Sequence, residues 1–264
     1  MSPTRAPAVA GFFYPEDSAE LESALASYLA AVPAPPSGAP APKALIVPHA
    51  GFVYSGPVAA SAYARIAGQR HTIRRVVLLG PSHRIPLHGL AASGADAFET
   101  PLGAVPLDRE AIDQILDFPQ VQIFDAAHRE EHSLEVQLPF LQYVLEDFSL
   151  VPLSVGEAES EEVGEVIERL WGGPETLFVV SSDLSHYYDY ETARRLDTTT
   201  SRAIEALDAG ALGRESACGR APTRGLLVAA KRHKLSVETV DLRNSGDTAG
   251  DKARVVGYGS YVFS

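Results

Sequence analysis

The sequence predicts one α/β domain with a mostly parallel or mixed central sheet flanked by helices. Three observations lead to this fold class. The chain has 264 residues, of which 45% are hydrophobic and 21% charged, as in ordinary soluble globular domains. Short apolar runs rich in β-branched residues alternate with segments of helical periodicity. Three of these runs, at 44–51, 76–83 and 177–186, end in a polar turn that carries a histidine. We expect a single domain over 1–264, because a core of this size suits one unit better than two.

The N-terminal part predicts a helix and then an extended connection. Residues 17–31 are expected to be helical, since Asp17 and Glu20 have the spacing of a capping box and leucines recur on one face. Residues 32–42 contain five prolines, which exclude a helix or a central strand there. We expect that segment to run over the surface inside the domain.

The later elements alternate in type. Strands are expected at 44–47, 75–79, 150–155 and 177–180, and helices at 57–67, 108–117, 160–170, 191–208 and 222–233. Residues 84–107 predict short strands or loops, because Gly and Pro interrupt them. The apolar face at 134–145 predicts a helix kinked at Pro139. Residues 255–263 predict a closing strand at a sheet edge, since Gly257 and Gly259 weaken an interior strand.

Composition excludes several classes of function. The net charge of −12 argues against nucleic-acid binding and against an anionic membrane surface. A single cysteine rules out an internal disulfide and is typical of the reducing cytosol. Residues 1–11 show no signal peptide, and no apolar run approaches the length of a membrane span. We therefore expect a cytoplasmic protein.

His49 and His83 are the first candidate metal ligands. Each follows an apolar strand directly, in 48–51 and 80–83. Ligands of parallel sheets collect beyond the carboxyl ends of the strands. Either residue alone can be a turn histidine bonded for packing. Their separation of 34 residues is about one crossover unit, which would make them neighbours.

Cys218 is the third candidate ligand. It lies in a loop at 217–222 that is expected to open a helix, with Pro222 in the first turn. A helix N-terminus and the nearby Arg220 would both favour the thiolate, the form that binds metal. The alternative is a small buried apolar residue, as most free cysteines are.

Asp183 and His186 form a candidate proton-transfer pair. They lie three residues apart after a fully apolar strand, so the carboxylate can orient or charge the imidazole. Two alternatives stay open. The pair can supply metal ligands, or Asp183 can cap a turn while His186 lies on the surface.

Glu131 and His132 form another polar cluster, in which a carboxylate can orient an imidazole ring from outside the metal. The alternative is a solvated helix start. Tyr54, Ser82 and Arg220 are further candidates for ligand support or substrate binding. The remaining histidines lie in polar settings and are treated as background: His71, His88, His128 and His233. The spacing of a zincin, a P-loop, a Rossmann fingerprint and a nucleophile elbow is absent from the sequence.

Several motifs in order resemble the Memo family, whose prokaryotic branch is called AmmeMemoRadiSam system protein B. They are the segments at 7–15, 48–51, 79–83, 131–135, 181–186, 218–220 and 257–258. The resemblance implies a fold like that of class III extradiol dioxygenases. It also implies that His49, His83 and Cys218 bind the metal, and that Asp183 and His186 line the same cleft.

The resemblance implies a metal-dependent redox protein acting on a small-molecule substrate. Ring-opening dioxygenases use two histidines and a carboxylate, whereas Cys218 stands at the third position here. A thiolate shifts the preference toward copper or zinc as well as iron. The alternative function is a non-catalytic module that binds a phosphopeptide or another anion. The family name also implies partners, a radical-SAM enzyme and an AMMECR1-domain protein, and a single cysteine cannot hold the iron–sulfur cluster itself.

Overall fold

The computed structural model describes residues 4–34, 36 and 38–264, and its centre is four parallel strands. These strands lie side by side in the order β2 (Ala44–Val47), β9 (Thr176–Ser181), β3 (Arg75–Pro81) and β8 (Ser149–Val155). Nearly all of their residues are buried, which explains why the sequence shows continuous apolar runs here instead of alternation. Their carboxyl ends meet at one edge of the sheet.

Antiparallel pairing extends the sheet on both sides. Beyond β8 come β4 (Leu90–Ala92), antiparallel to it, and β7 (Val121–Ile123). Beyond β2 comes β12 (Val255–Phe263), antiparallel to it. The sheet is therefore mixed, and the predicted fold class is confirmed.

The expectation that 255–263 is an edge strand is wrong. β12 pairs with β2, with β10 (His186–Tyr188) and with β11 (Val237–Asn244), a strand that the sequence did not predict. The glycines of β12 serve close packing. A Cβ atom on Gly257 would lie 2.0 Å from the Asp197 carboxylate, so only glycine fits at that point.

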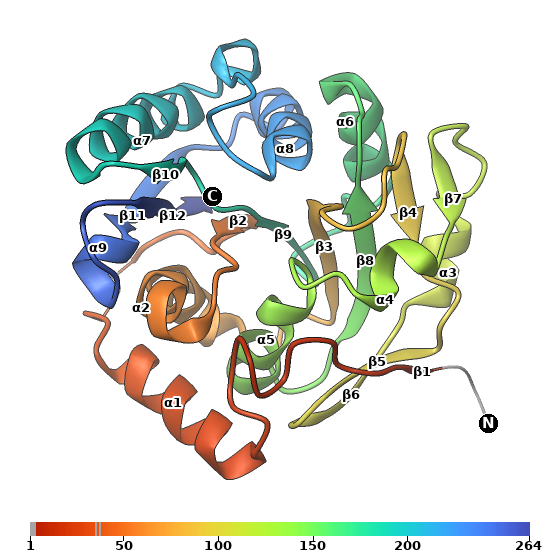
Figure 1. Cartoon of the computed structure of the whole chain (residues 1–264). Coiled ribbons are helices and arrows are strands. Elements are labelled where there is room, and N and C mark those ends of the chain that lie inside the picture. The colour runs from red at the N-terminus through yellow and green to blue at the C-terminus, as the bar shows by residue number, and fades with distance from the viewer. Residues whose placement is uncertain (1–3, 35, 37) are drawn as a thin grey trace.

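Helices cover both faces of the sheet, as Figure 1 shows, with α6, α7 and α8 on one side and α1, α2 and α5 on the other. The α-helices are α1 (Ser18–Ala30), α2 (Phe52–Tyr63), α3 (Arg109–Asp113), α4 (Ala126–Arg129), α5 (Leu138–Val144), α6 (Ser160–Arg169), α7 (Tyr190–Glu205), α8 (Arg220–Arg232) and α9 (Ser245–Thr248). Short 3-10 turns are η1 (Ala64–Gln69), η2 (Glu135–Gln137) and η3 (Ala209–Ala211). No helix in the described ranges is both long and apolar enough to cross a membrane.

Pro139 acts differently from the expectation, and α2 begins earlier than predicted. Pro139 lies at the start of α5, where a missing N–H costs nothing, so it begins that helix and does not kink one. Pro57 lies inside α2, which starts five residues earlier than predicted, at Phe52. That early start places the first turn of α2 directly after His49. A small separate sheet consists of β1 (Thr4–Arg5), β5 (Ala97–Thr100) and β6 (Gly103–Pro106). In β1, Arg5 donates hydrogen bonds to the carbonyls of His128 in α4 and of Glu131 in the loop after it.

Candidate metal site

Three histidines converge at the carboxyl edge of the sheet. His49 follows β2, His83 follows β3, and His132 comes from the loop between α4 and η2. The ring centroids are 5.3 Å apart for His49 and His83, 5.5 Å for His49 and His132, and 4.8 Å for His83 and His132. Within the described residues these three can hold a metal ion, because one nitrogen from each ring lies within 4.8 Å of the other two.

Hydrogen bonds fix the tautomers of two of these rings. The Ser181 hydroxyl donates to the carbonyl of Ser133, at 2.6 Å, so its oxygen accepts from Nδ1–H of His49, at 2.8 Å. The carboxylate of Glu131 accepts from Nδ1–H of His83, at 2.9 Å. Both rings therefore keep a lone pair on Nε2. Nitrogens that bind one zinc-like ion lie about 3.4 Å apart in tetrahedral geometry, so ring nitrogens within 4.8 Å of one another would move closer together to share it. The donors fit a transition metal.

Glu131 organises two of the three ligands. Its carboxylate accepts hydrogen bonds from the backbone N–H of His83 at 2.6 Å and from those of His132 and Ser133 at 2.9 Å each, besides the bond from the His83 ring. Burial alone would raise the pKa of Glu131, but the bonds and charge of His83 outweigh it and lower the pKa to about 2. A permanent carboxylate thus fixes the turn after β3 against the loop that carries His132.

The imidazoles of His49 and His132 are held in the neutral form that binds metal. Burial, and then the charges of His83 and His132, hold the pKa of His49 well below its ordinary value. Burial is also the largest cause that lowers the pKa of His132 to about 4, with the charge of Arg84 adding to it. Protons therefore compete weakly for these two rings at neutral pH.

Cys218 and Asp183 lie beside His49. The Cys218 sulfur is 3.3 Å from Nε2 of His49 and 3.3 Å from the backbone nitrogen of Asp183. The Asp183 carboxylate accepts from the backbone N–H of His49, at 2.7 Å. Burial, and then the charge of Asp183, raise the pKa of the Cys218 thiol. Without a metal, burial therefore outweighs the helix N-terminus and favours the protonated thiol. A bound metal would displace that proton, so the thiolate ligand stays a prediction.

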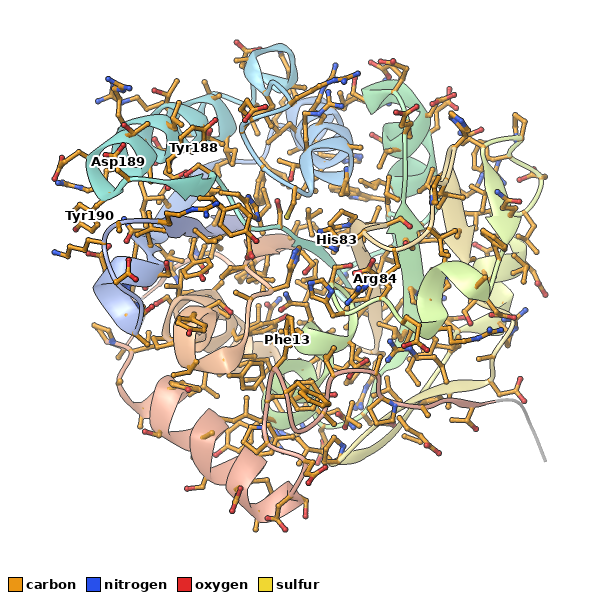
Figure 2. The ribbon with its side chains drawn as sticks, in the orientation of Figure 1. Phe13, His83, Arg84, Tyr188, Asp189 and Tyr190 are labelled. Atoms are coloured by element: carbon orange, nitrogen blue, oxygen red, sulfur yellow. The ribbon has the colours of Figure 1, made fainter. Side chains whose placement is uncertain are left out.

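The three histidines face a cavity of about 410 Å³. Its lining is Phe13, His49, Ala50, Gly51, His83, Arg84, His132, Asp183, His186, Tyr187 and Val256. Figure 2 shows His83 and Arg84 next to each other near the middle of the molecule, with Phe13 of the N-terminal turn beside them. The Phe13 ring packs against His132 with centroids 4.9 Å apart. The lining thus combines the polar imidazole rings with the apolar side chains of Phe13 and Val256.

The sequence matches a family model described as "Memo-like protein" over residues 5–262. The chain belongs to the Memo family. Similar curated proteins include the MEMO1 family protein of Aquifex aeolicus, 38% identical over 98% of both chains. The MEMO1 family protein of Metallosphaera sedula is 34% identical over 98% of this chain and 99% of that one. The predicted family is therefore confirmed.

The fold of this Memo chain also occurs in solved structures. The crystal structure of uncharacterized protein JW3007 from Escherichia coli K12 superposes with a TM-score of 0.54. The match covers 82% of this chain and 98% of that one at 12% identity. It supports the α/β architecture that the sequence predicts.

The Memo site differs in membership from the sequence prediction. His132, expected to support the ligands, forms with His49 and His83 a group that could hold a metal ion. His186 and Asp183 line the cavity, whereas Tyr54, Ser82 and Arg220 are not part of the lining within the described residues. The Ser82 hydroxyl instead donates to the carbonyl of Ile85 inside its own turn, at 2.6 Å. The roles of Cys218, Asp183 and His186 stay predictions.

Arg84 and Phe13 are among the lining residues that the sequence did not predict. Arg84 follows His83 directly and Phe13 lies in the segment 7–15 that carries the family resemblance, so proximity to a motif was the available signal. Neither residue type has a spacing rule that would select it.

His128, which the sequence did not single out as a site residue, is buried. Its burial leads us to expect that the stability of the protein depends on pH. Its Nε2–H donates to the carbonyl of Ala91 at 2.9 Å, and burial lowers its pKa to about 4. An unfolded histidine has a pKa of about 6.5. Between these values only the unfolded state takes up the proton, so His128 reduces the free energy of unfolding as pH falls, by about 2 kcal/mol at pH 5.

Urea unfolding of chelator-treated wild type and His128→Gln at pH 7.5 and pH 5 checks this effect. We expect the wild type to lose about 2 kcal/mol more than the variant over that interval. Equal losses in both proteins would show that His128 is protonated in the native state as easily as in the unfolded one.

Proposed function

We propose that this protein is a metal-dependent redox protein that binds iron or copper through His49, His83 and His132 and acts on a small-molecule substrate. The observation that carries the proposal is the convergence of three imidazoles on one cavity, two of them with tautomers set by buried acceptors. Imidazole ligands suit iron, copper and zinc. Three protein ligands leave a position open for substrate, as catalytic metal sites require.

Cys218 is the competing third ligand, from the family resemblance. Its sulfur lies close enough to His49 Nε2 to share an ion with it, since ligands at about 2.0–2.3 Å from a metal lie about 3.5 Å apart in tetrahedral geometry. A thiolate in the site would favour copper(I) or zinc. With all four residues bound the site would be closed, which is typical of structural metal.

The chain's own residues can handle protons beside the metal. A bound redox metal would supply electron transfer to the substrate. Burial raises the pKa of Asp183 to about 7, so its carboxyl group can hold or release a proton near neutral pH. His186 lines the same cavity, and burial lowers its pKa, so it is available as a neutral base. We assign the acid and base roles to these two residues.

Metal content tests the ligand set. We expect His83→Ala to abolish most metal binding, and His132→Ala to weaken it more than Cys218→Ser, because the three rings already share one centre. Plasma mass spectrometry of proteins purified without chelator, with competition titrations, measures this. The opposite order for His132 and Cys218 would assign the third ligand to the thiol. Oxygen uptake with reductants then tests redox activity.

The second candidate function is a non-catalytic module for a phosphopeptide or another anion, which a cavity lined by imidazoles also suits. Metal-free native protein with tight phosphopeptide affinity would establish it. For partners, we propose a radical-SAM enzyme and an AMMECR1-domain protein acting as separate chains. Such an enzyme must bring its own cluster, because this chain has one cysteine. Co-purification tests that association.

A further inference from the structure

Arg84 is a cation on the cavity wall whose charge is not neutralised by the protein. It follows His83 in the turn after β3, and Figure 2 shows the two side chains together. Its guanidinium group takes part in no ion pair or hydrogen bond with any other described residue. Arg5, Arg75 and Arg243, by contrast, each contact a carboxylate. An unpaired guanidinium at the rim of a cavity has all its donors available for a ligand.

The cavity lining carries a free cation, Arg84, although the chain is acidic. The protein has 34 acidic residues and a net charge of −12. Yet Asp183 supplies the one carboxylate of the lining, and that group is 5% exposed and already bonded to the backbone of His49. The N-terminus of α2 adds to the positive potential, since Ala50 and Gly51 of the lining directly precede it. An anion would find complementary charge here and repulsion over most of the remaining surface.

We propose that Arg84 anchors the carboxylate of a small organic acid, which makes such acids the substrate class of this site. The planar guanidinium matches a planar carboxylate with two parallel N–H···O bonds. Phe13 and Val256 offer apolar surface for the body of the acid. A volume of about 410 Å³ suits a small molecule. Calling the acid a substrate rests on the proposed function, but its binding to Arg84 does not need the metal.

Calorimetric titration of the full chain with benzoate, as purified and after chelation, tests the proposal. Benzamide has the same shape without the charge. We expect benzoate to bind both preparations and benzamide to bind at least about tenfold more weakly. Arg84→Gln should lower the benzoate affinity by about tenfold to a hundredfold, as loss of charged hydrogen bonds does. The benzoate affinity of Arg84→Lys should lie between those of the wild type and Arg84→Gln, because lysine keeps the charge but cannot form two parallel N–H···O bonds.

Arg195→Gln is the matched control, since it removes an exposed arginine from α7, away from the cavity lining. It should bind benzoate like the wild type. Equal affinity of the two glutamine variants, equal binding of benzamide, or no binding of benzoate would each overturn the proposal. Tighter binding of inorganic phosphate than of benzoate, with the same dependence on Arg84, would overturn the carboxylate class. The metal content of the protein as purified is measured in parallel. If that preparation contains no metal and still binds benzoate through Arg84, the redox function alone is refuted.

Discussion

Replacing Glu131 by glutamine is expected to weaken metal binding about tenfold to a hundredfold, the usual effect of losing a partner that orients ligating histidines. The carboxylate accepts from the ring and the backbone of His83 and from the backbone of His132 and Ser133. An amide at this place turns its NH₂ group toward at least one N–H donor. At the place of Oε2 the NH₂ group faces the backbone N–H of His83, so the turn that carries His83 loses its bond to the loop that carries His132. The ring of His83 loses its acceptor if the NH₂ group takes the place of Oε1 instead.

Competition titration with a metal-binding dye gives the affinities for wild type and Glu131→Gln. Glu130→Gln is the control, because the side chain of Glu130 is exposed and lies outside the metal cavity. Circular dichroism shows whether the variant keeps its fold. Unchanged affinity in a folded Glu131→Gln protein would mean that the histidines hold their positions through the backbone alone.

The sequence predicts those site residues that directly follow a strand of the parallel sheet. His49 and His83 each follow a buried parallel strand. The carboxyl ends of β2 and β3 lie at the same edge of the sheet, which brings the two histidines close together. Asp183 follows β9, which lies between those two strands, and it meets the backbone of His49 as a consequence. The pattern of apolar runs is sufficient for this because each run is buried on both faces.

The parts that the sequence could not predict depend on loops. His132 stands in a run of acidic residues that suits a solvated helix start equally well. Only the packing of the 130–135 loop over β3, through bonds such as Ser133 to the carbonyl of Pro81 at 2.9 Å, brings it to His83. β11 was missed because its residues are only half-buried and alternate irregularly. Neither feature has a local signature, because long-range contacts determine both.

Glu135→Leu is expected to lower the free energy of unfolding by about 3–5 kcal/mol, the range for breaking a buried ion pair. The Glu135 side chain is fully buried and paired with Arg5, which is also buried. The Glu135 carboxylate also accepts hydrogen bonds from the backbone N–H of Ala8 at 2.8 Å and of Val9 at 3.0 Å, and from the hydroxyl of Tyr14 at 2.6 Å. Leucine would leave the donors of Ala8, Val9 and Tyr14 without this acceptor and Arg5 without its counter-charge, although Arg5 keeps its bonds to the carbonyls of His128 and Glu131.

The double variant Arg5→Leu with Glu135→Leu shows which contacts matter. If the ion pair alone were responsible, two apolar residues of similar volume would restore stability, as they often do for buried pairs. We expect no such recovery, because the donors of Ala8, Val9 and Tyr14 stay unsatisfied in the double variant. Arg5→Leu alone should cost less than Glu135→Leu, since the carboxylate then keeps three of its donors. Urea unfolding of the wild type, the two single variants and the double variant at pH 7.5 gives the four free energies of unfolding that are compared. A double variant as stable as wild type would show that Glu135 serves only to neutralise Arg5, and that the turn carrying Phe13 to the metal cavity is held by other contacts.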